Sequence, residues 1–193
     1  DGARVAAAIT EAVAEDLGLA DPLLPWHGDR RRPATLAAAL GVLAGAVAKV
    51  AKDVTLLAQG EVAEVREGDD GDGARGGSSA MAHKRNPVAA ISAAACAARA
   101  PGLVATMLSV MDGEHERAAG GWQAEWETLR ELLRCTGAAV AWLRDLLERL
   151  EVDPVRMEVN LVAMLGDAAD SREQALAAAG PLVDRALAAH AAR

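Results

Sequence analysis

The chain has 193 residues, 52% of them hydrophobic, and it contains no Phe and no Tyr. Its core must be built from Ala, Leu, Val and four Trp, which favours helices because Ala and Leu are strong helix formers. The net charge is −8 and the basic residues are scattered, so nucleic-acid binding is not expected, whereas an anionic substrate is not excluded.

Neither a metal site nor a membrane span is expected from the sequence. Cys96 and Cys135 have no metal-ligand spacing, and both lie in Ala-rich stretches that are typical of buried thiols. Residues 1–20 contain no basic leader, and no continuous run of about 18 apolar residues occurs. We therefore expect no signal peptide, no contact with a membrane, and a cytoplasmic location.

The first half of the chain predicts two helices. Residues 3–19 form the first, which Gly18 closes, and residues 34–66 form the second, which begins after Pro33. The apolar residues of the second helix are spaced alternately four and three apart, which is a heptad seam. The seam consists of Leu36, Leu40, Leu43, Val47, Val50, Val54 and Leu57.

A second heptad seam follows in residues 122–150. Two long helices with such seams are typical of a bundle of near-parallel helices. One chain cannot cover both faces of these helices, so we expect partner helices from other subunits, from sequence outside this chain, or from both. The seam consists of Trp122, Trp126, Leu129, Leu133, Thr136, Val140, Leu143, Leu147 and Leu150, and we expect the two Trp in the core.

The stretch between the two seams predicts a loop. Residues 68–77 contain five glycines, so we expect residues 68–83 to be the most mobile internal segment. A helix should begin at Asn86-Pro87 and break at Pro101-Gly102. Asp153-Pro154 should start another helix, and Gly180-Pro181 should separate the last two helical pieces. No strand is predicted.

Residues 76–87 read Gly-Gly-Ser-Ser-Ala-Met-Ala-His-Lys-Arg-Asn-Pro. This segment resembles the signature Gly-Ser-Ser-x-Met-Pro-x-Lys-x-Asn-Pro of the fumarase/aspartase superfamily, with Ala82 in place of the first proline. Its second half is most similar to that of the 3-carboxy-cis,cis-muconate cycloisomerases. The same resemblance extends to Trp26-His27 followed by Arg30, and to residues 114–117, 122–129 and 152–161.

The resemblance implies an all-α fold: a long-helix bundle of the fumarase/aspartase type with a reduced C-terminal helical domain. Residues 1–150 would belong to the central bundle, including the signature loop 68–87, and residues 151–193 to the reduced domain. The resemblance also implies a homotetramer in which three subunits donate three segments to each active site. Only the signature segment is found here, so the chain alone should carry an incomplete site.

By position, Ser78 matches the serine regarded as the general acid/base of the family. A serine is a poor base unless backbone N–H groups and a nearby cation stabilise its oxyanion. The matched substrate-binding positions are Ser79, Met81, His83, Lys84 and Asn86. The resemblance implies no metal and no organic cofactor.

The implied reaction is the reversible cycloisomerisation of 3-carboxy-cis,cis-muconate, a small polycarboxylate of aromatic catabolism, to a carboxylated lactone. One alternative is another lyase of the superfamily, which would form fumarate by β-elimination. A second alternative is a non-catalytic helical remnant that serves oligomerisation. The missing site segments and Ala82 favour the remnant, whereas Ser78, Lys84 and Asn86 disfavour it.

Overall fold

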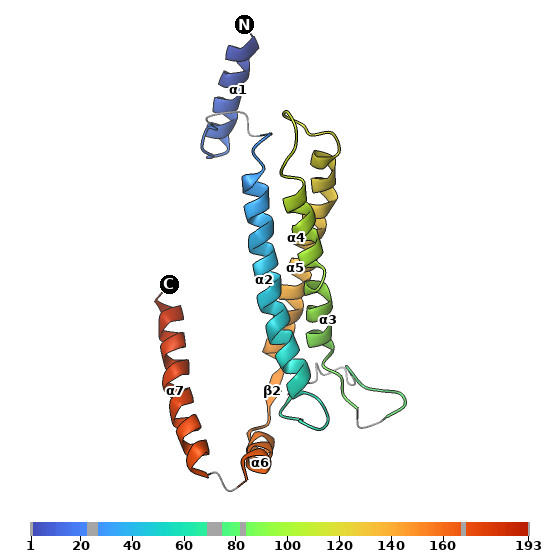
Figure 1. The fold of residues 1–193 in the computed structure, drawn as a ribbon, viewed down its shortest axis with the longest axis vertical. Helices are drawn as coiled ribbons and strands as arrows, with labels where there is room; N and C mark the ends of the chain where they lie inside the picture. The colour runs from blue at the N-terminus through green and yellow to red at the C-terminus, as the bar shows by residue number, and fades with distance from the viewer. Residues whose placement is uncertain (1, 23–26, 69–74, 82–83, 167–168, 193) are drawn as a thin grey trace. The chain divides into compact units, whose positions relative to one another are not determined.

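The computed structural model describes residues 2–22, 27–68, 75–81, 84–166 and 169–192 (Figure 1). Helices dominate, so the predicted all-α class is confirmed. The helices are α1 (Gly2–Asp16), α2 (Arg31–Leu57), α3 (Val88–Ala97), α4 (Ala100–Ser109), α5 (Gly121–Glu148), α6 (Pro154–Leu165) and α7 (Ala169–Ala191). Two short strands accompany them, β1 (Val65–Glu67) and β2 (Leu150–Val152).

The chain folds as two compact units. The first comprises residues 1–52 and 89–147, and the second comprises residues 53–88 and 148–193. The sequence predicts a different division, with residues 1–150 in the central bundle and residues 151–193 in a reduced C-terminal domain. That division stays a prediction.

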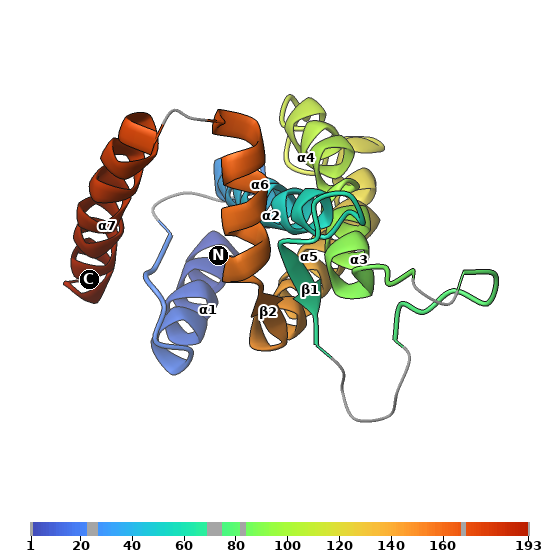
Figure 2. The same cartoon turned by 90° about the horizontal axis from the view of Figure 1, so that it is seen from below.

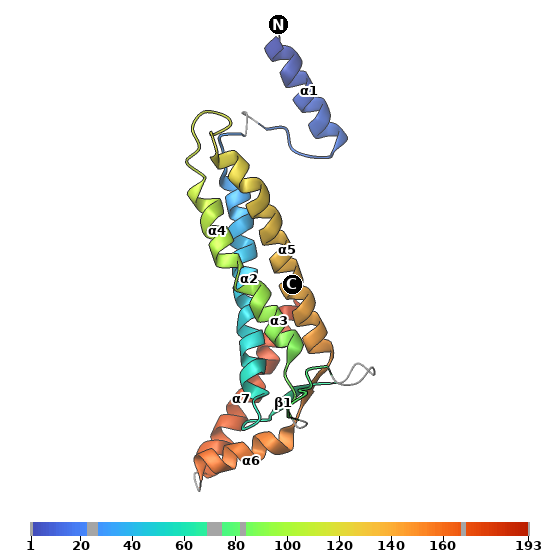
Figure 3. The same cartoon turned by 90° about the vertical axis from the view of Figure 1, so that its right-hand side faces the viewer.

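In the first unit, α2, α3–α4 and α5 lie side by side as a bundle (Figures 1 and 3), which Figure 2 shows end-on. The core between them is built mainly from alanines, which let the helix backbones approach closely. Gly41 of α2 is part of this close approach, since a Cβ there would lie 2.8 Å from Val104 Cγ2. The buried core consists of Ala37, Ala44, Val47, Ala51, Ala93, Ala97, Ala100, Met107, Leu132, Cys135 and Ala139.

The two predicted seams only partly coincide with this core. In α2 the buried positions Ala37, Ala44 and Ala51 repeat every seven residues beside Val47, whereas Leu36 and Leu43 are exposed. The sequence pattern identified the larger residues as the core. In the structure the alanines of α2 face the neighbouring helices of the chain together with Val47, whereas Leu36 and Leu43 remain exposed.

The same arrangement occurs in α5, where Leu132, Ala139 and Leu146 are buried at heptad spacing. The apolar residues that directly follow these buried positions in the sequence are exposed, and they repeat every seven residues. Trp126, seven residues before the first of them, is exposed as well, so the prediction that it is a core residue is wrong for this chain. We call these residues the α5 stripe: Trp126, Leu133, Val140 and Leu147. The expectation that one chain cannot cover its own seams agrees with this exposure.

The second unit contains a two-stranded antiparallel sheet, which contradicts the prediction of no strands. β1 pairs with β2 so that Val65 lies opposite Val152. The strands are three residues long and lie 85 residues apart in sequence, so neither carries an alternating pattern of its own. The predicted helix 34–66 is correspondingly too long, because α2 ends at Leu57 and turns lead into β1.

Most predicted helix ends are confirmed. α3 begins at Val88, α4 begins beside Pro101, and the Asp153 carboxylate caps α6 by accepting a hydrogen bond from Arg156 N at 2.9 Å. The predicted break at Gly180-Pro181 is wrong, since α7 continues through Pro181. A proline removes one backbone hydrogen bond, and the Ala-rich sequence around it sustains the helix.

Two helical stretches, Arg31–Leu57 and Val88–Ser109, are long and apolar enough to cross a membrane by length and composition. This is weak evidence, because core helices of soluble proteins meet the same criterion. Both stretches supply residues to the alanine-rich core described above, which gives their apolar character another explanation.

Candidate active site

The signature segment closes on itself at a narrow neck in the second unit. Gly77 and Arg85 form an antiparallel bridge. Beside it, Asn86 donates two hydrogen bonds to the carbonyl oxygen of Gly76, from its backbone N at 2.8 Å and from Nδ2 at 3.2 Å. Residues ten positions apart are thereby held together immediately before α3 begins at Val88.

The register of this neck brings the predicted residues together. With Gly77 opposite Arg85, the next pair along an antiparallel ladder is Ser78 and Lys84. Because side chains alternate between the two faces of a ladder, this register favours Ser78, Lys84 and Asn86 on one face and Arg85 on the other. The bridge thus brings the backbone segments that carry three predicted site residues close together.

The Ser78 hydroxyl oxygen is held in a tight turn. It accepts hydrogen bonds from the backbone N–H groups of Ala80, at 3.3 Å, and Met81, at 3.2 Å. Two N–H dipoles aimed at one oxygen favour negative charge on that oxygen. A negative charge on the Ser78 oxygen would therefore be stabilised by these two backbone N–H groups.

The remaining predicted residues lie around this turn. Ser79, Met81 and Lys84 are exposed, and the Lys84 N–H donates to the Met81 carbonyl at 3.0 Å. Asn86 is partly buried, and its Nδ2 is already bonded to Gly76. His83 lies outside the described residues, as does half of the segment 68–83 for which mobility is predicted.

The start of the loop is anchored by contacts that the sequence reasoning missed. Gly68 N–H donates to the Arg149 carbonyl at 2.8 Å and so extends the β1–β2 pairing by one bond. Arg156 and Asn160 of α6 both donate to the carbonyl of Val62, at 3.1 and 2.8 Å. The family resemblance of residues 152–161 was the only sequence signal for these anchors.

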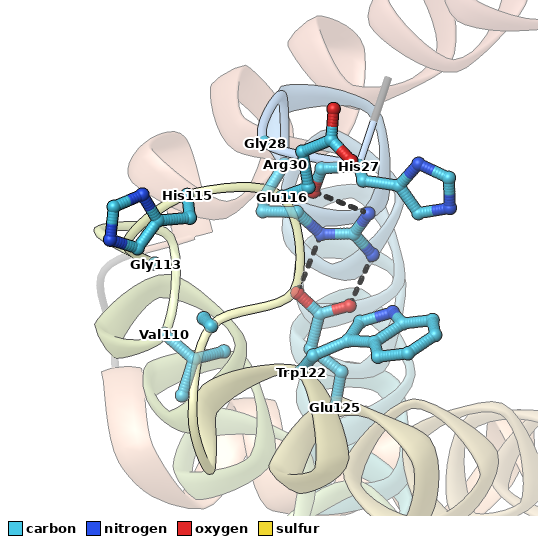
Figure 4. A pocket seen from close by; sticks show the side chains of 10 residues that line it. His27, Gly28, Arg30, Val110, Gly113, His115, Glu116, Trp122 and Glu125 are labelled. Carbon is cyan, nitrogen blue, oxygen red and sulfur yellow. Dashed lines mark hydrogen bonds and ion pairs between the residues drawn. The ribbon is translucent and has the colours of Figure 1, made fainter. Parts of the chain in front are cut away.

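A second polar cluster lies in the first unit, where the segment before α2 meets the start of α5 (Figure 4). Arg30 binds Glu125 with two parallel hydrogen bonds, Nε to Oε1 at 2.8 Å and Nη2 to Oε2. Glu125 raises the pKa of Arg30 above its usual value, chiefly through these hydrogen bonds. The His27 ring packs edge-on to Trp122 at 6.1 Å, and Arg117 stacks over the same Trp at 5.8 Å.

Within this chain the cluster is a packing contact that encloses little space. The cavity beside it measures about 10 Å³, which is room for about one water molecule. In the described part of the chain, moreover, no group of three or more His, Cys, Asp or Glu is arranged to hold a metal ion.

Comparison with known proteins identifies the family. The profile of a family described as Lyase matches residues 1–102, which is more than half of the chain. A 3-carboxy-cis,cis-muconate cycloisomerase from Bradyrhizobium diazoefficiens is 49% identical over 158 residues, which cover 82% of this chain and 35% of that protein. A nitrosuccinate lyase from Streptomyces davaonensis is 44% identical over 153 residues, which cover 79% of this chain and 32% of that protein.

The fold agrees with this result. The crystal structure of 3-carboxy-cis,cis-muconate lactonizing enzyme from Pseudomonas putida superimposes with a TM-score of 0.75 at 39% identity, covering 88% of this chain and 36% of that one. The chain spans about a third of the length of the curated relatives it matches. The matched family is the one that the signature at residues 76–87 indicates, and this chain therefore belongs to the lyase family of the fumarase/aspartase superfamily.

Proposed function

We propose that this chain supplies the signature segment of the active site of a 3-carboxy-cis,cis-muconate cycloisomerase, with Ser78 as the general acid/base. The proposal rests on the surroundings of the Ser78 hydroxyl oxygen. This oxygen accepts hydrogen bonds from two backbone N–H groups, and the register of the neck pairs Ser78 with Lys84. Backbone donors together with a cation are what a serine oxyanion requires.

The proposed chemistry follows from this arrangement. In the lactonising direction, a substrate carboxylate oxygen adds to one alkene carbon, and the neighbouring carbon, which is alpha to another carboxylate, gains a proton. Ser78 donates that proton and becomes an alkoxide, which the N–H groups of Ala80 and Met81 stabilise. In reverse, the alkoxide removes the same proton, and Lys84 stabilises the negative charge that develops on the carboxylate.

The substrate in this proposal is a small polycarboxylate. Lys84 would bind a carboxylate by its charge, and the part of the Asn86 amide that is not bonded to Gly76 would donate a hydrogen bond to it. Ser79, Met81 and His83 complete the proposed substrate-binding set. No cofactor is proposed, because proton transfer and lactone closure require none.

The proposal needs partner subunits. The α5 stripe and the exposed leucines of α2, Leu36 and Leu43, are apolar surfaces at heptad spacing, which is typical of helices that pack against further helices. We propose a cytoplasmic homotetramer whose other subunits cover these surfaces and donate the remaining site segments. The 193-residue chain by itself should therefore have no turnover.

A second candidate is another lyase of the superfamily, which would cleave a substituted succinate by β-elimination. It is favoured by the 44% identity to the nitrosuccinate lyase, since the signature segment handles a carboxylate that both kinds of substrate share. The residues of this segment do not distinguish the two reactions.

An ultraviolet assay of the complete gene product distinguishes the cycloisomerase from the second candidate, the β-eliminating lyase. Loss of 3-carboxy-cis,cis-muconate absorbance is expected, together with formation of a lactone. Formation of fumarate from substituted succinates, without muconate turnover, would instead establish the second candidate. Inactivity on both classes by a folded tetramer would favour the non-catalytic remnant.

A further inference from the structure

Gly76 lies one residue before the signature motif, and the motif assigns it no role. Its carbonyl oxygen nevertheless accepts both hydrogen bonds that close the neck, from Asn86 N and Asn86 Nδ2. Its backbone is left-handed, with φ of 78°. In that conformation Gly76 turns the chain so that Gly77 can pair with Arg85.

The neck leaves no space for a side chain at this position. A Cβ on Gly76 would overlap the Asn86 carbonyl oxygen and would lie 3.1 Å from the Asn86 carbonyl carbon and from its amide nitrogen. These are backbone atoms of the residue that leads into α3, so they cannot rotate away as a flexible side chain could. Substitution therefore has to open the neck, in addition to straining the left-handed backbone.

Opening the neck would displace the proposed catalytic group. Ser78 lies two residues after Gly76, and its turn is linked through the neck to Asn86 at the start of a rigid helix. We propose that Gly76 is a positioning residue for the reaction proposed above, because its carbonyl and its missing side chain set Ser78 against Lys84 and Asn86. This inference rests on the proposed function, since it presumes that Ser78 transfers the proton.

The expected loss of activity follows from how far Ser78 would be displaced. A displacement of about 1 Å in a catalytic group costs about 100-fold in rate. We therefore expect Gly76→Ala in the complete enzyme to lower kcat/KM about 100-fold while the melting temperature changes little, because the neck is partly exposed and lies outside the alanine-rich core.

Two control glycines separate the possible causes. Gly18 is left-handed with φ of 63° and has open space around it, so Gly18→Ala reports the cost of backbone strain alone. Gly60 has open space and no left-handed backbone, so Gly60→Ala reports the substitution itself. Both controls should retain wild-type kcat/KM. Gly76→Asn is the decisive variant, because Asn tolerates a left-handed backbone but still carries the Cβ that the neck excludes.

The experiment combines kinetics with hydrogen–deuterium exchange of the peptide that spans residues 75–87. We expect Gly76→Ala and Gly76→Asn to lose activity to a similar extent and to exchange faster at the Ala80, Met81 and Asn86 amides. Recovery of activity in Gly76→Asn would overturn the steric part of the assignment, which the proposal requires. Unchanged exchange in both variants would overturn it as well.

The proposed function and this inference fail in different ways. Turnover that does not depend on Ser78 would refute the proposed function, and the positioning role with it. Turnover that depends on Ser78 but survives both Gly76 substitutions would refute only the positioning role. A fall in melting temperature with unchanged activity per folded protein would likewise assign Gly76 a purely structural role.

Discussion

The Arg30–Glu125 pair provides the most direct test of how the first unit is held together. Both side chains are largely buried, with 12% and 6% of their side-chain surface exposed, and the pair has bidentate geometry. Glu125→Gln preserves the size of the side chain but removes the charge. The buried guanidinium of Arg30 then lacks its partner carboxylate, and it stays protonated because the ordinary pKa of arginine already lies above the accessible pH range.

Removing one partner of a buried pair costs about 3–5 kcal/mol, and we expect about 3 kcal/mol here because the pair lies near the end of the bundle. For a chain of this length, 1 kcal/mol corresponds to about 2–4 °C, so the melting temperature should fall by about 6–12 °C. The assay is thermal unfolding followed by circular dichroism. Replacing both residues, as Arg30→Met with Glu125→Leu, should recover most of this loss, because no unpaired charge remains.

The neighbouring Arg31–Asp29 pair is the matched control. It is also bidentate, with Nε and Nη2 of Arg31 at 2.8 and 2.6 Å from the two carboxylate oxygens, but 82% and 42% of the two side chains are exposed. Asp29→Asn should therefore leave the melting temperature nearly unchanged. An equal effect of Glu125→Gln and Asp29→Asn would refute the reasoning that burial determines the contribution of the ion pair.

Three further predictions concern packing, association and pH. The Thr136 hydroxyl is buried in α5 and has no hydrogen-bond partner among the described residues, so Thr136→Val should stabilise the fold by about 1 kcal/mol in denaturant titrations. Leu133→Glu combined with Val140→Glu charges the α5 stripe, and sedimentation should then show smaller species than the tetramer proposed for the wild type. The Ala119 N–H donates a hydrogen bond to the Glu114 carboxylate and lowers its pKa. This hydrogen bond therefore contributes its full stability at pH values above the ordinary pKa of a glutamate. It should be lost as pH falls through the lowered pKa, which carboxyl NMR titration can follow.

The sequence predicted the helices well and their buried faces less well. The signals for helix starts at Asn86-Pro87 and Asp153-Pro154 are local, so they could be recognised without knowledge of the tertiary structure. The burial of Ala37 rather than Leu36 depends on how closely neighbouring helices approach, and a heptad pattern carries no information about that distance. β1 and β2 could not be predicted, because each strand exists only through its pairing with the other.

In the candidate site, too, the local features could be predicted from the sequence, whereas the tertiary contacts could not. The motif identified Ser78, Lys84 and Asn86, but it did not reveal that a neck draws their backbone segments together, because that follows from the bridge between Gly77 and Arg85. The resemblance of the segments around Arg30 and Glu125 was visible in the sequence. Their ion pair was not, since 95 residues separate the two partners.

The central claim is that Ser78 transfers the proton, and the direct measurement is kcat of Ser78→Ala in the complete gene product with 3-carboxy-cis,cis-muconate. Ser109→Ala serves as the control, because this serine lies at the end of α4 and donates to the Thr106 carbonyl, away from the signature segment in sequence. The account predicts that Ser78→Ala abolishes turnover with unchanged helicity, while Ser109→Ala keeps the wild-type rate. Near-wild-type turnover by Ser78→Ala would contradict the account and would leave Lys84 and Asn86 as substrate ligands only.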